Sequence, residues 1–234
     1  MISKLCAASA MTLAGLLLTG TASAQRPGSG EQGVSGAPPA PGQALELSVG
    51  TGYAQGFGNV GNRLPPITDT SGAGGAIAVA VGYRVDPTLQ FDLYGTGAQF
   101  ARGNNVDGSA SIYSATLGIE AAWHLLPQQR FDPWVSLGTG WRGYWVSTTP
   151  GTSSMHAWEL ARLQVGVDYR LSRTVALAPV IGADLSMFYA QESVGQATFS
   201  GVGEPALTPF VFAGVLGRFD IALSPAATAQ AAAR

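Results

Sequence analysis

The sequence has few of the residues on which soluble and cofactor-dependent proteins rely. Charged residues make up 11% of the 234 residues, against about 25% in typical soluble domains. Cysteine occurs once, at Cys6, and histidine twice, at His124 and His156. So few thiol and imidazole groups give no visible metal-ligand cluster, and we expect neither a metal nor a cofactor. The formal net charge of -2 gives no reason to expect a nucleic-acid partner.

Long apolar runs are also scarce, and the one at the start has the pattern of a secretory signal. Residues 1–24 have a short basic start ending at Lys4, an apolar run over 5–18, and Ala22-Ser23-Ala24 before Gln25. The run is shorter than the about 20 residues that a transmembrane helix needs. We therefore predict a cleaved signal peptide and export. Because Cys6 lies inside this segment, we expect no disulfide in the exported chain.

The chain after the signal divides into three parts. Residues 25–43 are rich in Pro, Gly, Ser and Gln and predict a flexible linker. Residues 44–223 predict a barrel, and residues 224–234 a short Ala-rich tail. Alternation with period two indicates eight strands, near 44–54, 74–85, 88–101, 110–124, 130–146, 157–171, 174–190 and 208–222.

The connections between these strands alternate in length. Those after the second, fourth and sixth strands are compact, as in "VDPT" and "LSRT", and those after the first, third, fifth and seventh are longer, as in "RGNNVDGS" and "STTPGTSSM". Short periplasmic turns and longer extracellular loops are typical of outer-membrane barrels. The sequence thus predicts an all-β fold, an eight-stranded antiparallel up-and-down transmembrane β-barrel with both termini in the periplasm.

The two faces of the predicted strands differ in chemistry. One is apolar, and the other collects small residues, acids and arginines in nearly equal numbers. Few charges on a polar, glycine-rich face favour a narrow closed interior over a solvated surface. We therefore predict that ion pairs plug the lumen, formed by Glu46, Arg84, Asp92, Glu120, Arg142, Arg162, Asp168, Arg170, Asp184, Arg218 and Asp220.

Aromatic residues gather near the strand ends, where rings at the level of lipid headgroups are expected. The predicted periplasmic belt consists of Tyr83, Phe91, Trp123, Phe131, Tyr169 and Phe219. The predicted extracellular belt consists of Tyr53, Phe100, Tyr113, Trp145, Phe188 and Phe210.

Two positions disturb the pattern. Pro179 falls inside a predicted strand, which predicts a bulge or a shifted strand start. Trp158 and Arg162 share the parity of one face, which predicts either a Trp in the lumen mouth or a bulge between them.

Segments such as "VGVDYRL", "PWVSLGTGWRGYW" and "LGIEAAWHLLP" make residues 44–222 resemble the small outer-membrane barrels of the OmpA and OmpX type. The resemblance implies a monomer in the outer membrane of a Gram-negative bacterium, with a charge-plugged lumen and exposed loops. Its implied partners are outer-membrane lipids, lipopolysaccharide and the insertion machinery. The chain departs from this pattern because no aromatic residue ends it, so an insertion signal would lie near Phe219 and Ile221. The tail is also too short for a peptidoglycan-binding domain.

The expected role is structural or interactive through the loops, with at most a low-conductance pore and no enzymatic activity. One alternative is a lipid-modifying enzyme that uses Ser153 or Ser154 with His156 as base and Glu159 orienting the ring. Against it, no His-x-Ser triplet occurs in the sequence. The other alternative is a soluble exported binding barrel of the lipocalin kind, in which the apolar face would surround a ligand.

Overall fold

The computed structural model describes residues 40–61, 64–195 and 198–222. The predicted signal peptide, most of the linker and the tail lie outside these residues. The elements are β1 (Ala44–Gly56), α1 (Ile67–Thr70), β2 (Ser71–Arg84), β3 (Leu89–Arg102), β4 (Ser111–His124), β5 (Phe131–Thr148), β6 (Gly151–Arg170), β7 (Val175–Glu192), β8 (Ser200–Gly201) and β9 (Leu207–Ala222).

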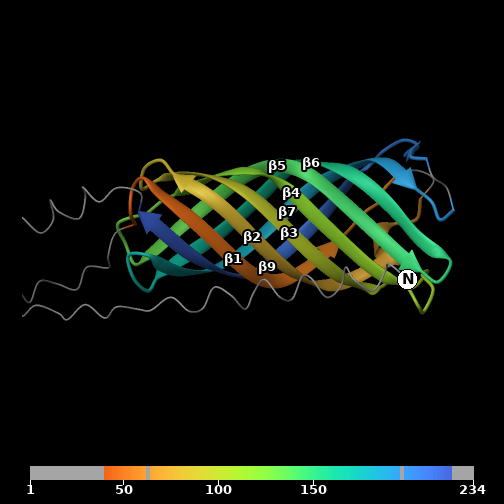
Figure 1. Cartoon of the computed structure of the whole chain (residues 1–234), viewed down its shortest axis with the longest axis horizontal. Coiled ribbons are helices and arrows are strands. Elements are labelled where there is room, and N and C mark those ends of the chain that lie inside the picture. Colours follow the sequence, from red (N-terminus) through yellow and green to blue (C-terminus); the bar gives the residue numbers. More distant parts are fainter. Residues whose placement is uncertain (1–39, 62–63, 196–197, 223–234) are drawn as a thin grey trace, which may run out of the picture. The chain divides into compact units, whose positions relative to one another are not determined.

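Eight long antiparallel strands close into a barrel (Figure 1). Each pairs with its neighbour in the chain, and β9 closes the ring by pairing with both β7 and β1. The two-residue strand β8 pairs with the end of β7. The predicted all-β, eight-stranded up-and-down barrel is confirmed. No helix among the described residues is long and apolar enough to span a membrane.

The two ends of the barrel differ. Ala44 pairs with Ala222, so β1 begins at the same end of the barrel at which β9 ends. Residues 85–88, 125–130 and 171–174 connect strands at this end, which we call the termini end. Asp86 shapes one of these turns, since its Oδ1 accepts hydrogen bonds from the backbone N–H groups of Thr88 and Leu89. The segments 57–61, 64–70, 103–110, 149–150, 193–195 and 198–206 lie at the other end, the loop end.

One predicted long loop is instead a tight hairpin. β5 and β6 pair up to Thr148 and Gly151, which leaves only Thr149 and Pro150 between them. The Ser, Thr and Gly content of this segment predicted a loop, and that prediction was wrong. β-branched Thr suits a pleated strand, and the Ser147 and Thr152 hydroxyls hydrogen-bond across the pair at 2.9 Å.

The irregular positions of β6 and β7 have different outcomes. Gly140 pairs with Glu159 and Gly138 with Arg162, so one extra residue of β6 bulges beside Leu160. The predicted bulge between Trp158 and Arg162 is therefore confirmed, and Trp158 is exposed.

The bulge or shift predicted at Pro179 is absent. Gly166 pairs with Val180 and Tyr169 with Leu177, which is the same register on both sides of Pro179. The ladder with β6 is interrupted beside Pro179, since proline has no N–H to donate, while Pro179 itself pairs with Val215 of β9.

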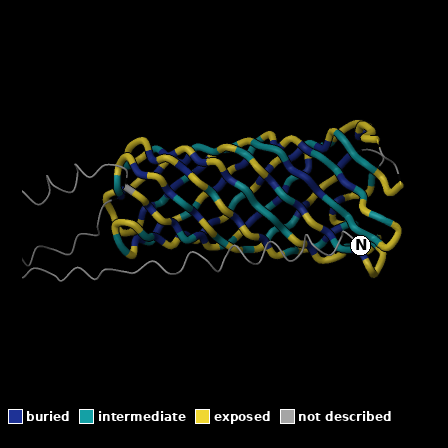
Figure 2. Tube along the Cα trace, in the orientation of Figure 1, coloured by how far each residue is buried: buried dark blue, intermediate teal, exposed yellow. Residues whose placement is uncertain are grey.

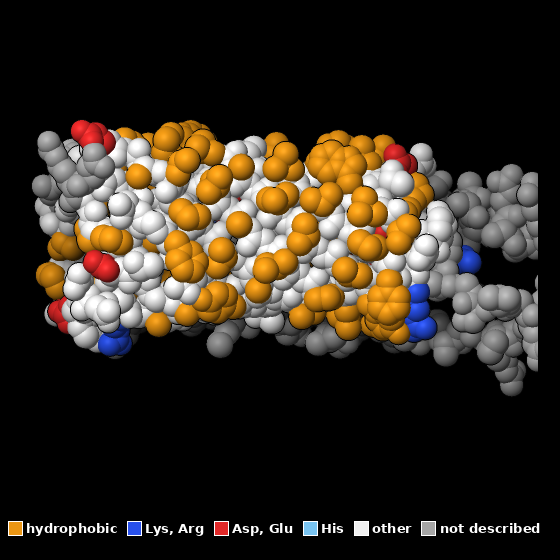
Figure 3. Space-filling model, turned by 180° about the vertical axis from the view of Figure 1, so that it is seen from behind, with side chains coloured by type: hydrophobic (Ala, Val, Ile, Leu, Met, Phe, Trp, Pro, Cys, Tyr) orange, Lys and Arg blue, Asp and Glu red, His pale blue; other side chains and the backbone are white. Residues whose placement is uncertain are grey.

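Buried and more exposed residues alternate along the strands (Figure 2). Ile119, Ile181 and Leu93 are among the large apolar side chains exposed on the wall. Hydrophobic side chains are spread along the face seen in Figure 3, while the visible charges lie mainly toward the two ends. The apolar face thus points outward and the charged face inward, which is the reverse of the lipocalin arrangement.

Candidate functional site: the filled lumen and its mouth

Two charged layers and two apolar clusters fill the interior of the described barrel, the smaller cluster including Phe212, Leu216 and Val180. We call the charged layer at the termini end the floor network, and the one above it the middle network. The larger apolar cluster lies at the loop end, and we call it the apolar layer. Together the charged layers contain all eleven predicted lumen residues. Ten of these are buried, and the eleventh, Glu120, has a side chain only 11% exposed.

The floor network is built on three arginines. Arg84 Nη2 lies 2.6 Å from Glu46 Oε2, and Arg170 Nη1 lies 2.9 Å from Asp220 Oδ2. Arg218 is placed between two acids, with Nη1 3.4 Å from Glu46 Oε1 and Nε 3.5 Å from Asp168 Oδ1. These bonds tie β1, β2, β6 and β9 together across the lumen. Removing one partner would leave an uncompensated buried charge.

His124 joins this network beside two aspartates. Its Nδ1 lies 2.8 Å from Asp132 Oδ2 and 3.8 Å from Asp168 Oδ2. Candidate ligand atoms of these three residues fall within 4.8 Å of one another, a spacing open to a metal ion. No local pattern in the sequence indicates this cluster, because its members come from three different strands.

The same contacts give the His124 cluster a role without an ion. Nε2 of His124 lies 3.4 Å from Arg218 Nη1, so the ring is engaged on both sides. Arg218 and Arg170 also flank the Asp168 carboxylate. The position of the His124 ring is explained by its contacts with Asp132 on one side and Arg218 on the other. We therefore assign no metal here.

The middle network centres on Arg142. Its Nη2 lies 2.8 Å from Asp184 Oδ2 and 3.1 Å from Glu159 Oε2. The same guanidinium donates from Nε to Ser186 Oγ at 3.0 Å and from Nη1 to Ser114 Oγ at 3.2 Å. A single side chain of β5 therefore links β4, β5, β6 and β7.

Arginine side chains in the lumen also stack on aromatic rings. Arg142 lies over Phe210 at 3.9 Å from the ring centroid, and Arg162 lies over Tyr94 at 4.1 Å. Arg218 lies over Trp134 at 4.3 Å. Cation–π contacts of this kind gain strength when the partners are removed from water. The aromatic rings therefore fill the space between the ion pairs.

Glu159 and Asp132 extend the predicted set of lumen residues. Both are fully buried, and Tyr94 Oη donates a hydrogen bond to Glu159. The bulge beside Leu160 brings Glu159 to the inner face, which strict alternation from Arg162 would not predict. Asp132 shares the inner face with Trp134 and was missed at the edge of a predicted strand.

These additions change the charge balance. In the described strands, the lumen contains five arginines and eight carboxyl groups: Glu46, Asp92, Glu120, Asp132, Glu159, Asp168, Asp184 and Asp220. The near-equal numbers expected from the sequence are thus replaced by a formal excess of acids.

The upper part of the lumen is apolar, which the sequence did not predict. Val60, Ile67 and Val202 from the loop-end segments pack on inward residues of the strands. Phe210 is 2% exposed and belongs to this layer, so its placement in an outer belt was wrong. The same correction applies to Phe100 and Phe188. An aromatic residue at a strand end suits both the lipid-facing wall and the lumen. Only its odd or even position along the strand tells which of the two faces it occupies.

The other nine aromatic residues of the predicted belts point outward. At the termini end these are Tyr83, Phe91, Trp123, Phe131, Tyr169 and Phe219, and at the loop end Tyr53, Tyr113 and Trp145. Arg130 lies over the Tyr169 ring at 4.7 Å at the termini end. At the loop end, His156 stacks on Trp141 and contacts the Trp145 ring.

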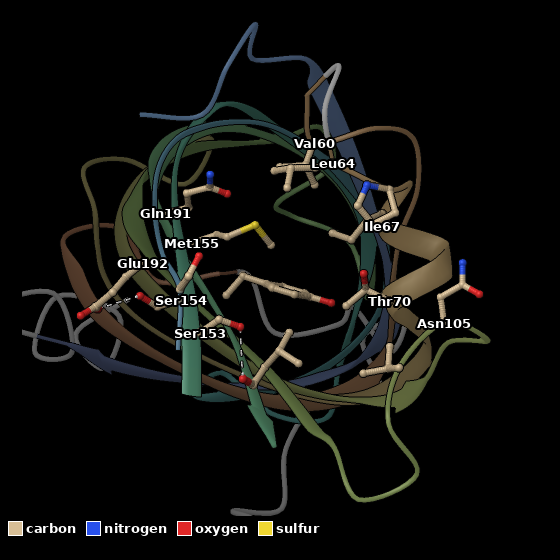
Figure 4. A pocket seen from close by; sticks show the side chains of 15 residues that line it. Val60, Leu64, Ile67, Thr70, Asn105, Ser153, Ser154, Met155, Gln191 and Glu192 are labelled. Atoms are coloured by element: carbon tan, nitrogen blue, oxygen red, sulfur yellow. Dashed lines mark hydrogen bonds between the residues drawn. The ribbon is translucent and has the colours of Figure 1, made fainter. Parts of the chain in front are cut away.

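A cavity of about 270 Å³ opens at the loop end, above the apolar layer (Figure 4). Val60, Leu64 and Ile67 lie on one side, with Ile67 on the helical turn α1. Met155 of β6 points toward them from the opposite side, beside Gln191 of β7, whereas the Glu192 side chain points away from the cavity. The cavity therefore has an apolar base and a polar wall.

The candidate catalytic residues are not brought together. Ser153 Oγ donates to the carbonyl of Val146, and Ser154 Oγ donates to Glu192 Oε2, both at 3.4 Å. His156 lies among aromatic rings, with Phe199 centred 5.1 Å away. Glu159 is inside the barrel with Arg142 and Arg162. No Ser–His or His–Glu hydrogen bond joins them in the described residues.

Comparisons with known proteins identify the fold. No protein-family model matches the sequence, and no curated protein matches it. The structure is similar to that of Neisserial surface protein A, with a TM-score of 0.51, 14% identity, and coverage of 75% of this chain and 96% of that one. It is also similar to the outer membrane protein OprG from Pseudomonas aeruginosa, with a TM-score of 0.52, 10% identity, and coverage of 78% and 99%. The chain thus has the fold of the small eight-stranded outer-membrane barrels.

Proposed function

We propose that this protein is a small integral outer-membrane barrel whose role is interaction with the outside through its loop end. The observation that carries the proposal is the contrast between its two parts. The lumen is filled by two charged networks and two apolar clusters, whereas the loop end has an open cavity and exposed segments. An eight-stranded barrel is just wide enough for side chains to fill its interior. Transport by free diffusion is therefore disfavoured.

The strand pairing and the side chains of the outer wall support insertion in a lipid bilayer. Every long strand pairs on both sides, so the closed barrel has no free edge, as spanning hydrocarbon requires. The wall displays large apolar side chains, which would be costly to leave in water. Export through residues 1–24, insertion as a monomer, and contact with outer-membrane lipids and lipopolysaccharide complete the proposal.

The orientation can be tested with a pair of epitope insertions. A tag placed in segment 103–110 at the loop end should be labelled by antibody on intact cells, because this end is proposed to face outward. The same tag in the turn 125–130, at the termini end, should be labelled only after the outer membrane is permeabilised. Labelling of the second tag alone on intact cells would reverse the orientation. Equal labelling of both tags after gentle lysis, with the protein in the soluble fraction, would contradict insertion.

The filled lumen predicts little ion flow in planar bilayers. The unmodified protein should show at most brief, low-conductance events, with cations favoured over anions because acids outnumber arginines inside. Arg142→Ala should raise both the conductance and the preference for K⁺, since it removes the side chain that spans the middle network.

The matched control is Arg173→Ala, in the exposed turn at the termini end. It should leave single-channel behaviour unchanged. A stable open pore in the unmodified protein, or a preference for anions, would contradict the filled lumen.

A second candidate function, lipid hydrolysis, has less support. Ser153, Ser154 and His156 have other partners, and Glu159 is inside the barrel. We therefore propose a role without catalysis.

A further inference from the structure

The four residues before β1, Ala40-Pro41-Gly42-Gln43, are attached to the termini end of the barrel. The backbone N–H of Ala40 donates a hydrogen bond of 3.0 Å to the carbonyl of Pro127, in the turn 125–130. Ala40 is only 5% exposed although it lies outside every strand. Its burial therefore comes from packing against the end of the barrel. We call residues 40–43 the strap.

The strap also runs beside a second turn. A β-carbon at Gly42 would lie 3.6 Å from Cδ of Pro87, so the backbone of the strap passes in van der Waals contact distance of the turn 85–88. The two turns are themselves joined, because the backbone N–H of His124 donates to the carbonyl of Thr88 at 2.8 Å. The strap thus bridges two of the three turns at the termini end.

Two members of the floor network lie at these turns. Arg84 ends β2, and its Nη1 donates to the carbonyl of Pro87 at 3.4 Å. His124 ends β4, and its Nδ1 lies 2.8 Å from Asp132 Oδ2. Both side chains are fully buried, at the end of the barrel where the lumen would otherwise meet water. Water admitted there would weaken these ion pairs, because their attraction depends on low dielectric surroundings.

The direction of the strap is set at one residue. Gln43 has a φ of 53°, in the left-handed region that residues other than glycine, asparagine and aspartate rarely adopt. Ala44, the next residue, already pairs with Arg84 and Ala222 in the barrel. The chain therefore turns from β1 into the strap at Gln43. Because Gln43 is exposed, substitutions there change the backbone preference with little effect on packing.

We propose that residues 40–43 form a gate, a strap that closes the termini-end mouth over Arg84 and His124 and whose release admits water to the floor network. The strap directly continues the predicted linker 25–43, so its attachment couples the linker to the lumen. This inference does not depend on the proposed role of the loop end.

The first part of the test locates the strap by disulfide formation. The full chain is refolded in detergent micelles with Cys6→Ser, so that no native cysteine remains. The pair Ala40→Cys and Pro127→Cys should form a disulfide on mild oxidation, because the backbones of these residues are hydrogen-bonded. The matched control pair is Ala40→Cys and Ser172→Cys, in the third turn, which should remain largely reduced.

The second part measures how well the strap seals the mouth. Diethyl pyrocarbonate acylates accessible imidazoles, and the chain contains only His124 and His156. His156 lies among aromatic rings on the outer wall at the loop end and serves as the internal reference. The labelling rate of each histidine is read by mass spectrometry of its peptide.

Two variants at one position provide the comparison. Gln43→Val places a β-branched residue at a left-handed φ and should release the strap, whereas Gln43→Gly accepts this conformation without steric cost. We expect His124 to be labelled about tenfold faster in Gln43→Val than in Gln43→Gly, the scale of the conformational penalty. The His156 rate should be equal in both. Oxidising the pair Ala40→Cys and Pro127→Cys within Gln43→Val should return His124 to the slow rate.

Three results would overturn the inference. Equal disulfide yields in the two cysteine pairs would mean that the strap is not placed at Pro127. Equal His124 rates in Gln43→Val and Gln43→Gly would mean that the strap does not seal the mouth. Faster labelling of both histidines in Gln43→Val would indicate a loosened barrel instead of a local gate. The cysteine pairs keep Gln43, so the first result is obtained even where Gln43→Val fails to fold.

Discussion

Replacing Arg218 by methionine is expected to lower the free energy of unfolding by about 3–5 kcal/mol, the usual cost of breaking a buried ion pair from one side. Methionine keeps much of the volume over the Trp134 ring but has no charge. Glu46 would lose one of its two arginines. Asp168 would keep His124, at 3.8 Å, and Arg170, at 3.9 Å, but would lose the guanidinium at 3.5 Å. The His124 ring would also lose the guanidinium beside its Nε2. The measurement is urea unfolding of the refolded protein in detergent micelles.

The control for this change is Arg173→Met, which removes the same charge from an exposed turn at the same end of the barrel. Exposed substitutions of this kind change stability by less than about 0.5 kcal/mol. Gel mobility of unboiled samples should show a larger unfolded fraction for Arg218→Met only. Equal stability of the two variants would mean that the floor network does not hold the barrel together.

Most of the fold could be predicted from the sequence because alternation is a local property. In a strand, parity alone decides which face a side chain occupies. Glu46, Arg84 and Asp220 were therefore assigned to the same side from three separate segments, and the structure brings their side chains together. The count of eight strands follows from the same period.

Features that depend on contacts between distant segments could not be predicted. Glu159 is inside only because a bulge shifts the phase of β6 at Leu160. The hairpin at Thr149 and Pro150 depends on the pairing of β5 with β6, which composition does not reveal. Strand parity, moreover, does not show how far a lumen residue lies from the termini end or the loop end of the barrel.

The apolar layer shows this limit most clearly. Phe100, Phe188 and Phe210 stand near the loop-end termini of strands, where both an outer belt and a lumen cap would place aromatic rings. Their burial depends on Val60, Ile67 and Val202, which come from segments that looked like solvent-exposed loops. The same segments build the cavity. The part of the site with the strongest functional signal was therefore the part least visible in the sequence.

Because the apolar side chains point outward, a charged substitution on the outer wall is expected to have a second large effect on stability. Leu117 lies near the middle of β4 and is 56% exposed on the outer wall. Leu117→Arg places a charge where the strand is proposed to cross the hydrocarbon core. We expect the free energy of unfolding in liposomes to fall by about 2–4 kcal/mol, the range for arginine near the bilayer midplane of such barrels.

The matched substitution is Leu171→Arg, at a similarly exposed leucine in the turn 171–174. Because this turn is proposed to lie at the membrane surface, the loss there should be about 0–1 kcal/mol. Both variants are measured by urea titration of the liposome-bound protein, followed by tryptophan fluorescence. In a water-soluble barrel an arginine at position 117 would face solvent and cost almost nothing. A loss at Leu117 no larger than that at Leu171 would therefore count against membrane insertion, whereas the expected difference would locate the bilayer core along β4.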